Sequence, residues 1–213
     1  MPKIGILAYG SLIEDPGGEL SPYIVKKIPN VATPFNIEFA RKSRKRGDGP
    51  TVIPVKNGGS SVKAYILELN DNIDIEKAKD LLWRRETGDK DSNSHYALPK
   101  NQTVNHVIIE SISDYPDFDH ILYTNIGSNI DNLDPVNLAK LAIDSAKSSA
   151  GEKGEDGINY LLSVKRQGIL TPLMPDYEKE ILKQTDTESL EEAISKIRKE
   201  VEHNKTLQLT GGS

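Results

Sequence analysis

The chain has 213 residues, of which 36% are hydrophobic and 28% are charged, with a net charge of −5 and no cysteine. This composition is that of a globular protein with a core of its own, and it excludes disulfides, thiolate metal sites and cysteine nucleophiles. The negative net charge disfavours sequence-independent binding to nucleic acid or to an anionic membrane, because both require a basic surface.

The first half of the chain is predicted to be mainly β-structure. Short apolar runs bounded by Gly, Pro and Asn predict strands at residues 3–8, 23–28, 35–40, 51–55, 61–69, 105–110 and 120–126. Asn57-Gly58-Gly59 predicts a hairpin turn, because glycine tolerates positive φ. One helix interrupts the strands at about 75–86, with Asp74 as its expected N-cap and Gly88 as its expected left-handed C-cap.

The second half is predicted to be helical after Asp134-Pro135, which is a helix-start signature. The expected helices cover residues 136–148, 157–167 and 188–203. Residues 185–188 are expected to form the capping box of the last helix, whose apolar stripe predicts packing against the body of the chain or a partner protomer. Strands first and helices later favour an α+β fold over alternating β-α units.

Glu86 is a candidate general acid/base. It follows three apolar residues at helical spacing, so it is expected to point toward the core near the C-terminal end of its helix. Those three residues are Ile75, Ala78 and Leu82. Burial and the negative end of the helix dipole both disfavour a charged carboxylate, which suits the group to accept and return a proton. The alternative is a structural ion pair with Arg84, Arg85 or another cation.

Tyr9-Gly10-Ser11-Leu12 directly follows the first predicted strand. A glycine at this point lets consecutive backbone N–H groups point into one concavity, an arrangement that holds carboxylates, phosphates or developing oxyanions. The alternative is a plain turn that ends the strand. The loop is therefore a candidate site for an anionic group.

The other polar motifs predict no further chemistry. The basic run 41–46 has no interleaved aromatic residues and is expected to be a solvated loop, with attraction of an acidic substrate or RNA as the alternative. The histidines lack the spacing of zinc ligands, and neither Gly-x-Ser-x-Gly nor a phosphate-loop motif occurs. The apolar stretch at residues 3–9 is too short for a signal peptide and no segment reaches membrane-spanning length, so a cytoplasmic protein is expected.

The loop and the glutamate together resemble a known family. Tyr9-Gly10-Ser11-Leu12-Ile13, after an N-terminal strand, resembles the signature loop of the gamma-glutamylcyclotransferase family, in particular of its glutathione-degrading branch. Arg85-Glu86 followed by Tyr96 resembles the family's catalytic glutamate segment, with a longer insertion than its usual glycine turn. Residues 51–67 are similar to its paired strands and residues 157–169 to its late helix. The resemblance covers about residues 4–170.

The resemblance implies a fold and a reaction. The fold is a small mixed β-barrel with flanking helices in residues 1–175, followed by a C-terminal helical extension in 176–206 and a flexible tail in 207–213. The reaction cleaves a gamma-glutamyl amide: the free α-amine attacks its own γ-carbonyl, 5-oxoproline forms, and an amine or amino acid departs. It requires neither a cofactor nor a metal.

The resemblance also implies residue roles. Glu86 would carry the proton from the attacking amine to the leaving nitrogen, while backbone N–H groups of residues 10–12 bind the substrate's carboxylate or carbonyl oxygen. Tyr9 and Tyr96 would line the pocket and donate hydrogen bonds, although either could equally be a core residue with a satisfied hydroxyl. The expected partner is a small gamma-glutamyl compound, and the protein is expected to be a monomer or homodimer. The alternative function is a catalytically inactive binding or regulatory module with the same anion pocket.

Overall fold

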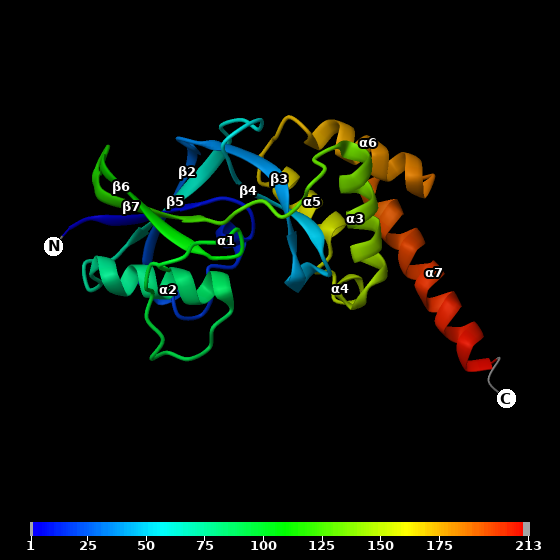
Figure 1. Cartoon of the computed structure of the whole chain (residues 1–213), viewed down its shortest axis with the longest axis horizontal. Helices are drawn as coiled ribbons and strands as arrows, with labels where there is room; N and C mark the ends of the chain where they lie inside the picture. The colour runs from blue at the N-terminus through cyan, green and yellow to red at the C-terminus, as the bar shows by residue number, and fades with distance from the viewer. Residues whose placement is uncertain (1, 211–213) are drawn as a thin grey trace. The chain divides into compact units, whose positions relative to one another are not determined.

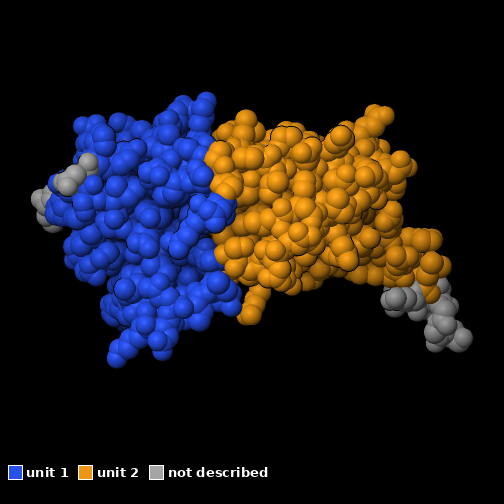
Figure 2. Space-filling view, turned by 45° about the horizontal axis from the view of Figure 1, so that its top comes forward, with its two compact units in different colours: residues 1–37, 54–57, 61–127 blue, residues 38–53, 58–60, 128–213 orange. Residues whose placement is uncertain are grey.

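The chain forms two compact units in this computed structural model, which describes residues 2–210 except for the side chains of residues 114 and 208–210. Unit 1 consists of residues 1–37, 54–57 and 61–127, and unit 2 of residues 38–53, 58–60 and 128–213 (Figure 2). The boundary predicted from sequence at residue 175 stays a prediction.

Unit 1 is built on a mixed five-stranded sheet (Figure 1). Its strands, in order across the sheet, are β2 (Ile24–Ala32), β5 (Lys63–Leu69), β1 (Ile4–Ala8), β7 (Phe118–Asn125) and β6 (Ile108–Tyr115). The central strand β1 runs antiparallel to β5 and parallel to β7, so that Ile6 lies opposite both Leu67 and Leu122. All five residues of β1 are buried, which explains its unbroken small and apolar sequence.

The helix α2 (Ile75–Thr87) packs beside β6 and β7 of the same unit (Figure 1). Its boundaries follow the predicted caps. The Asp74 carboxylate accepts a hydrogen bond of 2.8 Å from the Lys77 backbone N–H, and Gly88 has a φ of 74°. The predicted position of this helix is therefore confirmed to within one residue.

The predicted α+β class is confirmed, but two finer expectations are not. Within residues 2–210 the strands form an open sheet and a separate two-stranded sheet, and no closed barrel is found. The predicted hairpin at residues 57–59 is wrong: β4 (Gly49–Val55) pairs with β3 (Asn36–Ser43), not with β5. The reason is that β2 and β1 occupy both edges of β5, and a strand has only two edges to offer.

Unit 2 contains most of the helices. They are α3 (Pro135–Lys147), α4 (Ser149–Glu152), α5 (Gly157–Arg166), α6 (Met174–Thr185) and α7 (Leu190–Thr210). Helices α3 and α5 match the predicted ones to within one residue, whereas α7 begins two residues later and ends seven residues later than predicted, and α6 was not predicted. The predicted capping box at 185–188 is wrong because Thr185 ends α6; instead, the Ser189 hydroxyl accepts a hydrogen bond from the Glu192 N–H at 3.2 Å.

The expected tail at residues 207–213 is helical through Thr210, and residues 211–213 lie outside the described part of the chain. The expected solvated run at 41–46 covers the end of β3 and a 3₁₀ turn, η2 (Arg44–Arg46). Arg44 and Lys45 are exposed, whereas the Arg46 guanidinium lies 4.4 Å above the Tyr160 ring. The remaining short helices are α1 (Ser11–Glu14) and η1 (Ser21–Tyr23) of unit 1. Between residues 2 and 210 no helix combines the length and the apolar character needed to cross a bilayer.

The core of unit 2 contains an aromatic cluster of Phe39, Tyr160 and Tyr177. The Phe39 ring meets Tyr160 and Tyr177 edge to face, with ring centroids 6.3 and 5.3 Å apart. Phe39 and Tyr177 are fully buried. The Tyr177 hydroxyl has no hydrogen-bond partner among the described residues, which is an unfavourable place for a polar atom.

Tyr177→Phe is therefore expected to stabilise the protein. A buried, unpaired hydroxyl costs about 1–3 kcal/mol, and the substitution removes it while keeping the ring. Urea unfolding should give a free energy of unfolding about 1 kcal/mol higher than that of the wild type. A lower value would show that the hydroxyl has a partner that stabilises it.

The same substitution is expected to change the pH dependence of stability. Burial, and next the Asp156 carboxylate, raises the pKa of the Tyr177 hydroxyl. The folded state thus holds this proton more tightly, so stability is complete below the unfolded pKa of about 10 and falls above it by about 1.4 kcal/mol per pH unit. The advantage of Tyr177→Phe in urea unfolding should therefore widen between about pH 8 and about pH 11. A constant difference would contradict this assignment.

Candidate functional site

The loop at residues 9–12 lies in unit 1, where the buried strand β1 meets the short helix α1. Gly10 has a φ of 68° and a ψ of −139°, a conformation that side chains with a Cβ rarely adopt. Leu12 and Ile13 anchor α1 in the core. The N–H groups of Ser11 and Leu12 belong to the first turn of α1, where a helix offers them no acceptor of its own. The chain thus turns sharply and presents backbone donors.

Glu86 lies at the edge of the buried face of α2 rather than within it. Its side chain is 23% exposed, and that of Arg85 is 14% exposed. At about 100° per residue, Glu86 lies about 40° from the fully buried Leu82 and about 80° from the buried Ala78. The expected burial of Glu86 is thus met only in part: both side chains are half-buried, and Arg84 is the buried charged residue of the last turn.

Arg85 connects the glutamate to the loop (α2 and α1 in Figure 1). Its Nη1 donates to Glu86 Oε1 at 2.6 Å, and its Nη2 donates to Ser11 Oγ at 3.2 Å. Nε and Nη2 both donate to the Asp15 carbonyl, at 3.0 and 2.6 Å. The predicted residues Ser11 and Glu86 are therefore held on one guanidinium. The ion pair with Arg85 is also the structural alternative that the sequence left open for Glu86.

The two predicted tyrosines have partners of their own. The Tyr9 hydroxyl donates to the Thr124 carbonyl of β7 at 2.8 Å, and its ring meets Phe35 edge to face at 6.1 Å. The Tyr96 hydroxyl accepts a hydrogen bond of 3.1 Å from the Ile109 N–H of β6. Both side chains are half-buried and positioned on the sheet. These contacts fit the alternative in which each is a packed residue with a satisfied hydroxyl.

Two residues of α2 hold the segment that leads to Tyr96. Asp80 accepts hydrogen bonds from the Tyr96 N–H at 2.7 Å and from His95 Nδ1 at 2.6 Å when that nitrogen carries the proton. The buried Arg84 donates to the Ser94 carbonyl. Sequence reasoning missed Asp80, and named Arg84 and Arg85 only as partners for Glu86. The run Arg84-Arg85-Glu86, with cations on an otherwise apolar helix face, was the available signal.

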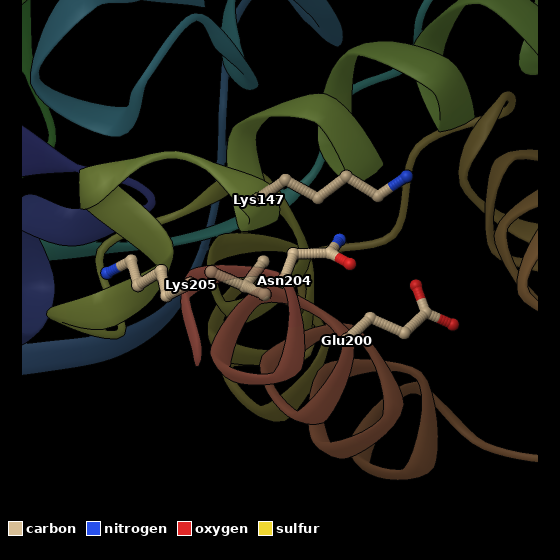
Figure 3. Close-up of a pocket in the computed structure, with 5 residues that line it drawn as sticks. Lys147, Glu200, Asn204 and Lys205 are labelled. Carbon is tan, nitrogen blue, oxygen red and sulfur yellow. The ribbon is translucent and has the colours of Figure 1, made fainter. Parts of the chain in front are cut away.

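A hollow of about 330 Å³ lies in unit 2, away from all the predicted site residues in sequence (Figure 3). Its lining residues are Lys147, Glu200, Val201, Asn204 and Lys205. The Lys147 and Glu200 side chains extend to one side, whereas Lys205 points the opposite way (Figure 3). The two ammonium groups therefore do not converge on one point, and we assign no chemistry to this hollow.

Gly10→Ala is expected to damage the loop. The positive φ of Gly10 disfavours a residue with a Cβ, at a cost of about 1–3 kcal/mol. Part of this strain would be relieved by shifting Ser11, and with it the contact to Arg85. The midpoint temperature of thermal unfolding should fall by about 2–12 °C, together with any activity of the site. Gly18→Ala is the control, because a Cβ there meets nothing within 4 Å.

Comparison with known proteins does not assign the chain to a family. No model of a known protein family matches the chain, and no curated protein matches it. Function is therefore inferred from the residues of unit 1 described above.

Proposed function

We propose that the protein is a cyclotransferase that cleaves a gamma-glutamyl amide bond and releases 5-oxoproline and a free amine or amino acid. The observation that carries this proposal is the guanidinium of Arg85, which contacts the Ser11 hydroxyl of the glycine loop and the Glu86 carboxylate. Two motifs 74 residues apart thereby belong to one cluster. This is the pairing that the resemblance to gamma-glutamylcyclotransferases requires.

The chemistry needs three functions from the site. The α-amine nitrogen forms a bond to the γ-carbonyl carbon, and the amide C–N bond breaks. One proton moves from the α-amine nitrogen to the leaving nitrogen. Glu86 carries that proton, and the N–H groups at the start of α1 stabilise the oxygen that becomes negative. Holding the glutamyl chain curled contributes further, since correct orientation is worth up to about 7–11 kcal/mol in intramolecular reactions.

The proposal extends to finer properties. It includes the family's fold, a small mixed β-barrel with flanking helices, which the mixed sheet of unit 1 supports at the level of α+β class. We also propose that the protein is cytoplasmic, that it is a monomer or homodimer, and that it acts on a small molecule without a cofactor.

The test is the release of 5-oxoproline from a panel of gamma-glutamyl amides, gamma-glutamyl peptides and glutathione. At least one compound should yield 5-oxoproline and its free amine in equal amounts. The amine identifies the leaving group, which the site does not specify. The absence of product from every compound would refute the proposed reaction.

A second candidate is a binding or regulatory module with the same anion pocket. The Arg85–Glu86 ion pair favours it, because the carboxylate already has a cationic partner. Saturable binding of 5-oxoproline or glutamate, without turnover of any panel compound, would favour this module over the enzyme.

A further inference from the structure

The Arg85 guanidinium has one donor left for a ligand. An arginine has five N–H donors, and Arg85 uses four of them in its bonds to Asp15, Ser11 and Glu86. The fifth, on Nη1, has no acceptor among the described residues. Because the side chain is only 14% exposed, little of it is left in contact with solvent. This donor lies on the nitrogen that also binds Glu86.

The Ser11 hydroxyl, which contacts the other terminal nitrogen of the guanidinium, offers a second donor. Its oxygen accepts from Arg85 Nη2 at 3.2 Å, which leaves its own proton to donate, and no described residue accepts that proton. An oxygen that binds both this hydroxyl and Arg85 Nη1 would be contacted by a neutral and a charged donor. Carboxylates are typical ligands of such sites, because they accept from arginine through two oxygens.

Opposite charges therefore lie side by side in the site, with 2.6 Å between Arg85 Nη1 and Glu86 Oε1. Adjacent residues of a helix point about 100° apart, so this pair does not arise from helix geometry alone. It depends on the Asp15 carbonyl, which fixes the guanidinium through two donors. A rigid pair of charges of this kind matches a ligand that carries a carboxylate and an ammonium group on one carbon atom.

We infer that Arg85, with the Ser11 hydroxyl, is the receptor for the α-carboxylate of the substrate, and that Glu86 faces the α-ammonium group of the same carbon. This inference rests on the proposed function and names its substrate class: compounds with a free α-amino acid head. Arg85 is then the specificity-determining residue. An α-carboxamide in place of the α-carboxylate loses its charge and meets Arg85 with a weaker acceptor.

The test compares the binding of L-glutamate and of L-isoglutamine, its α-carboxamide, by calorimetry with the full chain. The wild type should bind L-glutamate about 10- to 100-fold more tightly, and Arg85→Met should bind both equally weakly. Ser11→Ala, which leaves the guanidinium in place, should weaken L-glutamate binding by about 3- to 10-fold and hardly change L-isoglutamine binding. Arg166→Met of unit 2, which removes an exposed guanidinium paired with Glu191, is the matched control and should behave as the wild type.

Three outcomes would overturn the inference: no L-glutamate binding by the wild type, equal binding of the two ligands, or retained discrimination in Arg85→Met. If Arg85→Met unfolds more readily than the wild type, Ser11→Ala decides the matter, because it alters only a partly buried hydroxyl. The release of 5-oxoproline from the panel of gamma-glutamyl compounds is a separate measurement. Discrimination between the two ligands without 5-oxoproline release would refute the cyclotransferase reaction and support Arg85 as the carboxylate receptor. Release of 5-oxoproline without discrimination would support the reaction and refute Arg85 as the receptor.

Discussion

Glu86→Gln is expected to lower kcat for 5-oxoproline release by about 10²- to 10⁴-fold, the contribution of a positioned general acid/base. Glutamine keeps the size of the side chain and an oxygen that accepts from Arg85 Nη1, so the cluster with Ser11 and Asp15 should persist. What it lacks is a basic oxygen that can take a proton from the attacking amine. The measurement is the initial rate of product release with the best compound of the panel.

The control for this substitution is Glu76→Gln on the same helix. Glu76 is exposed and pairs with Lys79 at 2.7 Å, and surface pairs of this kind contribute at most about 1 kcal/mol. Its rate should equal that of the wild type. If Glu86→Gln lowers kcat by less than 10-fold and leaves thermal unfolding unchanged, Glu86 does not carry the proton.

Phe39→Ala is expected to have the largest effect on stability, about 3–5 kcal/mol. Phe39 is fully buried in unit 2 and meets Tyr160 and Tyr177 edge to face. Its removal leaves a cavity that two rigid rings fill only in part, and it removes both aromatic contacts, each worth about 0.5–1.5 kcal/mol beyond the buried area. Urea unfolding followed by far-UV circular dichroism measures the loss.

Leu170→Ala provides the comparison for Phe39→Ala. It also truncates a large apolar side chain of unit 2, but Leu170 is 63% exposed. Its effect should stay within about 0.5 kcal/mol. A loss below about 1 kcal/mol for Phe39→Ala would mean that unit 2 repacks around the missing ring.

Local signals predicted the elements that depend on neighbouring residues. Asp74 and Gly88 define α2 because an N-cap acceptor and a left-handed glycine act within one turn of the helix. The helix α6 was missed because its start has no side-chain cap: Leu173 precedes it, and its start signals are Pro175 and Asp176 in the first turn. The hairpin at 57–59 was wrong because a glycine turn reverses the chain without deciding which strands pair.

The sequence by itself determined the α+β class, the glycine-dependent turn at Gly10 and the presence of an acid at the end of α2. These follow from backbone preferences and helical periodicity, which act over a few residues. Only the tertiary structure decided that Glu86 stays partly exposed and pairs with Arg85, and that the Arg85 guanidinium contacts Ser11 and Asp15. Such contacts depend on how α2 packs against the sheet that contains β1, and no local preference encodes the distance between residues 74 positions apart.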